Sequence, residues 1–324
     1  MLNQADANPR IVSLAVQTDG KYLMLWEVRL PGVNNMAFIT RFHDDGTTDI
    51  NFNPGFGSAP LNVPLADNLL GKQGFKVREG DGAVFAAFAT THADSVIIKL
   101  HSNGLRDTAF GDDGQVNLHN TVLHDLAFPH NGGLLVAGHN GGHAIIARYT
   151  DAGLPDHPFG QAGVVELALE QDGRIRSVFS IAVDTHNKIT VVGSDAQPRH
   201  IHNFIASFTA DGHLDPSFHQ GVPVQTGVED GSYVSHVVQQ DGKIVVLARE
   251  QSTGFTTKLV RYNHEGHKDN SFGNAGVALA YTRSSGPGQA HVSTVELQHP
   301  GEKFLVSGPN ANYYTYITRL LNDT

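Results

Sequence analysis

The chain has 324 residues, 40% of them hydrophobic and 17% charged, with 35 glycines and 14 prolines, which is typical of a folded protein built from many short elements and turns. Its formal net charge is −10 and its 22 Lys and Arg residues form no basic run, so nucleic acid is not expected as a partner. The sequence has no cysteine, which excludes disulfides, thiolate nucleophiles and cysteine-based zinc sites.

The N-terminus shows no targeting signal. Residues Met1–Asp6 contain neither a basic start nor an apolar run, so no secretory signal peptide is predicted. No stretch reaches the roughly 20 apolar residues of a membrane helix, so membrane insertion is not expected. We expect a cytoplasmic location, with signal-independent export as the alternative.

The first unit of a repeat follows in chain order. The apolar run Val12–Val16 leads to the turn Asp19-Gly20, and a later strand, Phe38–Phe42, ends in an arginine and an aromatic residue. The turn Gly46-x-x-Asp49-x-x-Phe52 comes next. Because Asp-Gly between apolar runs is a strong hairpin signal, the unit is predicted to be a small antiparallel sheet.

This Gly-x-x-Asp-x-x-Phe turn, followed by a further glycine, recurs along the chain. Five copies begin 49 to 59 residues apart, at Gly46, Gly104, Gly153, Gly212 and Gly266. Apolar runs before and after each turn, such as Val164–Leu167, complete four strands per unit of about 50 residues. The sixth copy, from His291, reaches Thr324 before its Asp-x-x-Phe turn and its fourth strand.

A four-stranded sheet of this kind has two apolar faces, and identical sheets bury both when they are arranged radially. We therefore predict an all-β fold, a six-bladed β-propeller with four antiparallel strands per blade, as a single domain over residues 1–324. The blades are expected at residues 11–61, 69–118, 121–167, 177–226, 232–280 and 291–324. Either the residues before Arg10 close the last blade as its outer strand, or that blade keeps three strands.

Four segments match a known repeat most closely: Gln240–Ile244, Ala147–Tyr149, Ala210–Phe218 and Asp269–Gly276. They resemble the delta-60 repeat family of bacterial propeller proteins, whose unit contains Gln-x-Asp-Gly-Lys, Ala-Arg-Tyr and Leu-Asp-x-x-Phe-Gly. The resemblance spans about Ile11 to Leu321, although the second unit departs from it at Gly80–Ala83. It implies a propeller and brings no defined reaction and no catalytic residues.

The first strand of each unit is expected to line the axis. One position of this strand is held by Ser13, Phe75, Asp125, Ser180, Ser235 and Thr294, and the position two residues later by Ala15, Val77, Ala127, Ala182, Val237 and Glu296. Both positions lie on one face of the strand, where crowding alone favours small residues. Asp125 and Glu296 instead bring carboxylates to the axis. We interpret them, with Lys76, Arg78, His124 and His236, as a candidate site for a cationic or hydroxylated ligand.

No metal and no cofactor is predicted. The segment Asp44–Asp49 contains several oxygen ligands of the kind that calcium binds. The structural explanation is favoured, because all five copies share the same turn: the aspartate caps it, the glycine allows a positive φ, and the phenylalanine fills the space between blades. The 19 histidines include three close pairs, none with the His-Glu-x-x-His spacing or a third ligand: His119 with His124, His139 with His143, and His200 with His202.

Functions from different classes remain open. The leading interpretation is a non-enzymatic binding module that engages a protein or a carbohydrate through a propeller face or the axial mouth, with variable loops such as 227–231 and 281–288 in recognition. The alternative is a hydrolase or lyase acting on a glycoside or lactone, with Asp125 and Glu296 as its carboxylates and other catalytic residues unknown. A structural role within a larger assembly is the third interpretation.

Overall fold

The computed structural model describes most of the repeated part of the chain. The described residues are 8–29, 36–63, 74–90, 94–167, 176–195, 203–226, 232–249, 256–281, 294–298, 303–309 and 315–320. The chain forms two compact units, one of residues 1–128, 132–141 and 148–156 and one of residues 129–131, 142–147 and 157–324. Regular structure in the described residues is β, apart from the single 3-10 turn η1 (His219–Gly221). No helix in these ranges is long and apolar enough to span a membrane.

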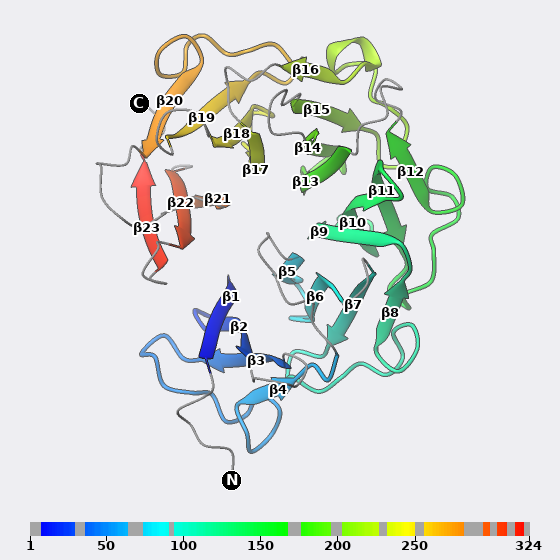
Figure 1. Ribbon diagram of the computed structural model, residues 1–324, viewed down its shortest axis with the longest axis vertical. Coiled ribbons are helices and arrows are strands. Elements are labelled where there is room, and N and C mark those ends of the chain that lie inside the picture. The colour runs from blue at the N-terminus through cyan, green and yellow to red at the C-terminus, as the bar shows by residue number, and fades with distance from the viewer. Residues whose placement is uncertain are drawn as a thin grey trace. The chain divides into compact units, whose positions relative to one another are not determined.

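The first unit contains two four-stranded antiparallel sheets whose strands follow chain order (Figure 1). Their strands are β1 (Asn8–Val16), β2 (Tyr22–Arg29), β3 (Met36–Phe42) and β4 (Ser58–Pro60), then β5 (Gly74–Val77), β6 (Val84–Ala89), β7 (Ser95–Leu100) and β8 (Gln115–Leu118). The antiparallel pair β9 (Thr121–Ala127) and β10 (Leu134–Asn140) completes the unit. The boundary between the units passes through the third sheet, whose strand order is β12-β11-β10-β9.

The second unit contains the antiparallel pair β11 and β12 and three further sheets. Their strands are β11 (His143–Tyr149), β12 (Val164–Leu167), β13 (Arg176–Val183), β14 (Ile189–Asp195), β15 (Asn203–Phe208), β16 (Val224–Thr226), β17 (Ser232–Val238), β18 (Ile244–Arg249), β19 (Thr257–Tyr262), β20 (Val277–Tyr281), β21 (Thr294–Gln298), β22 (Lys303–Pro309) and β23 (Thr315–Leu320). The prediction of an all-β chain of antiparallel four-stranded sheets is thereby confirmed for five sheets. The last sheet, β21-β22-β23, has three strands within the described ranges.

The start of β1 corrects one expectation. In one of the two alternatives for the last blade, Asn8 and Pro9 lie before the first sheet, in the strand that closes the last one. They pair instead with Arg29 and Val28 as the first residues of β1, because the hairpin with β2 continues past Ile11 through a bulge. Residues 1–7 of the predicted closing strand lie outside the described residues.

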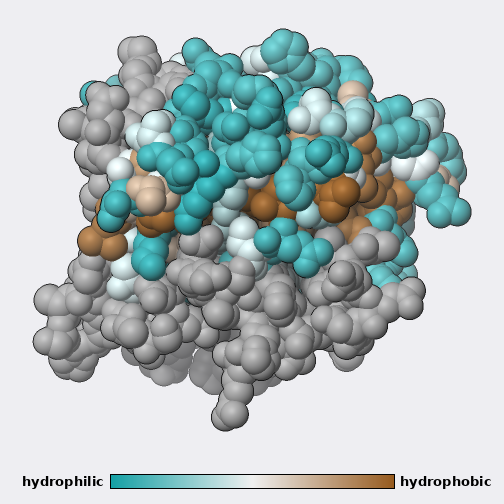
Figure 2. All heavy atoms as spheres, turned by 90° about the horizontal axis from the view of Figure 1, so that it is seen from above, coloured by the Kyte–Doolittle hydropathy of each residue, from teal (hydrophilic) through white to brown (hydrophobic). Residues whose placement is uncertain are grey.

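Each sheet has two apolar faces, and neighbouring sheets within a unit bury them against one another. In the first unit, Leu25 of β2 shares a core with Val84 and Phe88 of β6. In the second, Leu247 of β18 shares a core with Phe304 of β22. On the face of the molecule in Figure 2, hydrophilic residues cover most of the described surface and hydrophobic ones gather in a band. Since each fully buried large apolar side chain contributes about 1.5–3 kcal/mol, these stacked faces are the main stabilising feature.

The recurring turn joins each of the first four sheets to the following sheet by what we term the Phe–Gly contact. The phenylalanines Phe52, Phe110, Phe159 and Phe218 are buried, and a Cβ placed on the first glycine of the following repeat would lie 2.9–3.1 Å from their rings. The residue after each phenylalanine donates its N–H to the carbonyl just before that glycine, over 2.6–2.9 Å, in the pairs Asn53/Asn103, Gly111/Ala152, Gly160/Asp211 and His219/Glu265. Glycine is required there because its φ is positive and a side chain would occupy the place of the ring.

Candidate functional site

The register of the first strands corrects one member of the predicted axial row. Ser13, Asp125, Ser180, Ser235 and Thr294 pair with Leu25, Ala137, Val192, Leu247 and Ser307. In the second sheet the equivalent residue of the second strand is Ala87, and it pairs with Gly74 and not with Phe75. The reason is the turn between the first two strands, which spans residues 78–83 in the second sheet and only 239–243 in the fifth. The extra residue in this turn shifts β5 by one residue relative to β6. Lys76 therefore takes the place predicted for Val77 on the face that the first strands share.

Lys76 and Asp125 lie together. Lys76 Nζ is 3.4 Å from Asp125 Oδ1, and the lysine side chain is 36% exposed whereas that of the aspartate is 1% exposed. The same carboxylate oxygen accepts the N–H of Leu126 at 2.9 Å. Two strands from different sheets therefore hold a buried carboxylate beneath an ammonium group that reaches solvent.

Gly74 allows the two strands to approach. A Cβ at Gly74 would lie 3.1 Å from the side chain of Leu126 and 3.3 Å from the backbone carbon of Asp125. Such contacts are tighter than ordinary van der Waals distances, so any larger residue would push β9 away from β5. The glycine that the one-residue shift places in the row is thus the residue that brings Asp125 to Lys76.

Serines at the same position in the second unit have a structural role. Ser180 Oγ accepts the N–H of His236, and Ser235 Oγ accepts the N–H of Val295, each at 3.3 Å. These hydrogen bonds join the first strands of successive sheets. Small polar residues in the row are therefore explained by inter-sheet bonding as well as by crowding.

The ring of His124 lies against that of a histidine on the neighbouring strand, in a tilted arrangement. Its ring centroid lies 5.8 Å from that of His139, and the ring planes are inclined by 36°. Burial and the neighbouring His139 lower the pKa of His124 to about 4, although Asp125 acts in the opposite direction. At neutral pH the ring is uncharged and can either donate or accept a hydrogen bond. This pairing differs from the histidine pairs considered from the sequence.

The other predicted site residues have different contact partners from Lys76 and Asp125. Arg78 forms ion pairs with Asp81 and Asp151 and lies over the ring of Phe85. His236 is buried on β17 in the second unit, and Glu296 is exposed on β21, opposite Leu305. The structure thus brings together Lys76 and Asp125 within the first unit, whereas the ring contact of His124 is with His139. Loop 227–231 and residues 282–288 lie outside the described residues.

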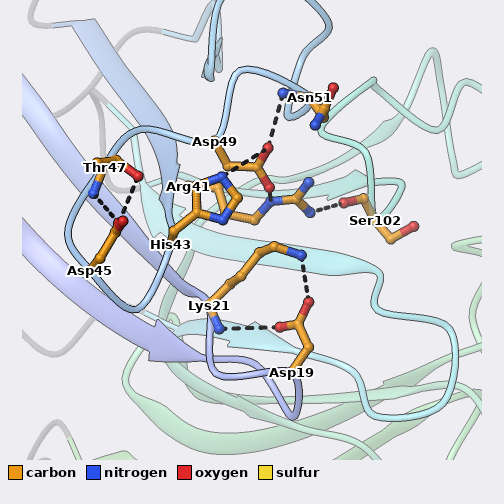
Figure 3. A network of polar contacts seen from close by, with 9 residues as sticks. All are labelled: Asp19, Lys21, Arg41, His43, Asp45, Thr47, Asp49, Asn51 and Ser102. Carbon is orange, nitrogen blue, oxygen red and sulfur yellow. Dashed lines mark hydrogen bonds and ion pairs between the residues drawn. The ribbon is translucent and has the colours of Figure 1, made fainter.

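The aspartates of the repeated turns are engaged in ion pairs (Figure 3). Arg41 Nε lies 3.0 Å from Asp49 Oδ2, and Asp49 Oδ1 accepts the N–H of Asn51. The same pair recurs as Lys99–Asp107, Arg148–Asp156 and Arg261–Asp269, at 2.8–3.0 Å. The constant spacing of eight residues between base and acid was the signal in the sequence that would have predicted these pairs.

One repeat forms its ion pair differently. In the fourth sheet the position of the arginine is held by Ser207, and Asp215 pairs instead with Lys188 from the start of the neighbouring strand, at 2.8 Å. Lys188 also lies 5.6 Å from the centre of the Phe218 ring, much as Arg41 covers Phe52. In four of the five repeats the basic partner of the turn aspartate lies over the turn phenylalanine, which gives the aspartate a structural role. Among the described residues no group of three or more acidic or histidine side chains is arranged for a metal ion.

A family model described as a domain of unknown function (DUF5122) beta-propeller matches residues 239–272, which contain β18, β19 and the Asp269-x-x-Phe272 turn. No curated protein gives a significant match. The matched segment is one repeat of the five that carry the complete turn.

Solved structures with low sequence identity share the fold. Drosophila Semaphorin 2a matches over 98% of this chain and 64% of its own, with 10% identity and a TM-score of 0.57. A mutant of AofleA from Arthrobotrys oligospora matches over 97% and 83%, with 10% identity and a TM-score of 0.53. The polysaccharide lyase Uly1 matches over 97% and 90%, with 9% identity and a TM-score of 0.50. Together with the family model, these similarities support a β-propeller fold.

Proposed function

We propose that the chain is a single-domain, six-bladed β-propeller whose first strands line the axis, and that it is a non-enzymatic binding module. Six antiparallel sheets in the described residues, each with the first strand in chain order at one edge, support the blade count. In this arrangement β5 and β9 present Lys76 and Asp125 toward the axial mouth. A rigid scaffold with a polar group at its mouth is a common setting for ligand recognition.

The Lys76–Asp125 pair is the observation that carries the binding function. The buried carboxylate fixes the ammonium in place, so the lysine binds a ligand without losing much conformational freedom. The solvent-facing member is the cation, which favours hydroxyl or carboxylate groups over a cationic ligand. We propose a carbohydrate ligand at this site, with an acidic protein surface as the alternative ligand.

A hydrolase or lyase acting on a glycoside or lactone is the second candidate, because Asp125 and Glu296 are carboxylates on first strands. Glycoside chemistry requires one carboxyl group that stays protonated. Asp125 is ion-paired with Lys76, and Glu296 is exposed on β21 opposite Leu305, so neither carboxyl group stands in the buried, uncharged setting of a general acid.

A screen of neutral and acidic oligosaccharides, followed by calorimetry on each hit, tests the proposal. Lys76→Met should weaken binding by about tenfold or more, the equivalent of one charge-assisted hydrogen bond. Lys21→Met is the matched control, because Lys21 is similarly exposed and paired with Asp19 in a turn. Equal binding by both variants would remove Lys76 from the site, and no binding by any glycan would remove carbohydrate as the ligand class. Release of a product that disappears in Glu296→Gln would favour the enzyme.

A further inference from the structure

The first copy of the repeated turn differs from the four later copies in one respect. Gly46 is exposed, whereas Gly104, Gly153, Gly212 and Gly266 are buried. All five have φ between 76° and 88°. A Cβ at each later glycine would meet the phenylalanine ring of the preceding repeat, but at Gly46 the nearest atom is Tyr22 Oη at 3.7 Å. The turn therefore has the backbone of a ring-binding site, and within the described residues no ring occupies it.

The hydrogen-bond acceptor of the Phe–Gly contact is present in this copy too. Asp45 precedes Gly46, in the place where Asn103, Ala152, Asp211 and Glu265 accept a backbone N–H from the preceding repeat. The Asp45 side chain caps the turn, because its Oδ1 accepts the N–H and the hydroxyl of Thr47 (Figure 3). In the described ranges no backbone N–H outside the strands donates to this carbonyl.

An apolar face adjoins this turn. Tyr22 stacks on Phe42 at 5.2 Å, and Trp26 stacks on Phe38 at 4.8 Å. All four are only half-buried, and Val16, which pairs with Tyr22, is 75% exposed. The corresponding residues of the fifth sheet, Ile244 and Tyr262, are 2% exposed and share a core with Phe218 of the preceding repeat. The four later copies thus show what covers such a face.

We propose that the Gly46 turn, with Tyr22 and Phe42, is a docking site for a segment of a partner chain that carries the Asp-x-x-Phe-Gly sequence and a short following strand. The phenylalanine ring would lie over Gly46, and the next N–H would bond to the Asp45 carbonyl, as at the other four turns. Residues 1–7 contain no aromatic residue and cannot supply the ring. A second copy of the chain is a poor source, because its five turn phenylalanines are at most 2% exposed. This site does not depend on the ligand proposed for Lys76 and Asp125.

A peptide with the sequence of residues 266–281, which contains Asp269, Phe272 and the strand β20, serves as the probe. Trp26 is the single tryptophan of the chain and lies on the apolar face, and the peptide contains none, so tryptophan emission reports on this face alone. We expect saturable binding by calorimetry with a change in emission. A peptide with Phe272→Ala should bind about tenfold more weakly or not at all. Equal binding of both peptides, or no binding of either, would overturn the proposal.

A matched pair of variants locates the site. Gly46→Ala places a methyl group where the ring would lie, whereas Gly20→Ala imposes the same positive-φ strain, at φ +85° in both, with open space around the methyl group. We expect the peptide to bind to Gly20→Ala as to the unmodified chain and to lose about tenfold or more with Gly46→Ala. The same loss in both variants would attribute it to backbone strain and contradict the proposal.

Discussion

At the scale of single residues, Asp125 stands where the second unit has serines. Ser180 and Ser235 each accept one backbone N–H with a neutral hydroxyl group, whereas Asp125 accepts the Leu126 N–H and also neutralises Lys76. Its carboxylate is almost fully buried, so its charge is tolerated because the ammonium lies beside it. The aspartate thus combines an architectural position with the fixing of a solvent-reaching cation.

Replacing Asp125 should separate these two roles. Asp125→Ala removes the acceptor of a buried N–H and the partner of Lys76, and should lower the free energy of unfolding by about 1–3 kcal/mol. Asp125→Ser keeps a hydroxyl acceptor of the kind found in the other sheets and should cost less. Urea unfolding of the two variants measures the difference. If both lost the same stability, the backbone hydrogen bond would not be the stabilising contact.

His124 should make stability depend on pH. Its pKa of about 4 in the folded chain lies below the ordinary value of 6.5, so between these values the unfolded chain binds the proton and the folded chain does not. Stability is therefore complete above pH 6.5 and falls as the pH drops toward 4, by up to about 3 kcal/mol for a shift of this size. His124→Phe, which copies Phe179 at the corresponding place, should flatten this part of the profile. Denaturant unfolding at pH 7 and pH 5 checks it, and an unchanged slope would contradict the assignment.

At the scale of elements, the ion pair over each turn phenylalanine tolerates a change of origin. Four copies take the basic residue from the strand just before the turn, and the fourth sheet takes Lys188 from the neighbouring strand. Burial acts to raise the pKa of Asp215, but hydrogen bonds from Lys188 and Ser217 hold it below its ordinary value. What the repeat requires is a cation beside the aspartate, wherever it comes from.

A compensating double change tests this requirement. Lys188→Met should lower the free energy of unfolding by about 1–2 kcal/mol, because it leaves a largely buried carboxylate without its charged partner. Adding Ser207→Arg restores the eight-residue spacing of the other repeats and should recover most of the loss. Thermal melting of the single and double variants measures both effects. A double variant as unstable as the single one would show that position 207 cannot hold the cation.

Strands and turns were predictable from the sequence because apolar runs and Gly-x-x-Asp-x-x-Phe turns recur with little change. The register of β5 was not, because its turn is one residue longer and counting back from Gly82 gives Phe75 in place of Gly74. The Lys188–Asp215 pair was also not predictable, since its partners are 27 residues apart, one just before β14 and one in the turn after β15. Local patterns thus predict elements well, whereas a single inserted residue moves a side chain to the other face.

At the scale of the whole molecule, the candidate site depends on contacts that the sequence did not reveal. Asp125 and Lys76 were both named from the sequence, but their pairing follows from the shifted register and from Gly74, which allows the strands to approach. Arg78 was predicted as a site residue because it follows β5 in the sequence, but its ion pairs are with Asp81 and Asp151. Residue types were therefore easier to predict than partners.

The proposed six-bladed arrangement predicts a direct observation. Averaged electron-microscopy images of the chain viewed along the axis should show six radial densities, one for each sheet, with the three-stranded last sheet giving the smallest. A larger partner such as a bound antibody fragment supplies the mass needed for alignment. Five or seven densities, or two separate bodies, would contradict the proposal.

The Phe–Gly contact has a direction, since at each of its four occurrences one repeat supplies the ring and the repeat after it supplies the glycine. These four junctions use the same two surfaces, whichever repeats supply them. A gene for a chain of this kind can therefore gain or lose a whole unit by duplication or deletion, and each new neighbour already carries the matching half of the joint. Units of 49 to 59 residues that tolerate differences in loop length are what such a history would leave behind.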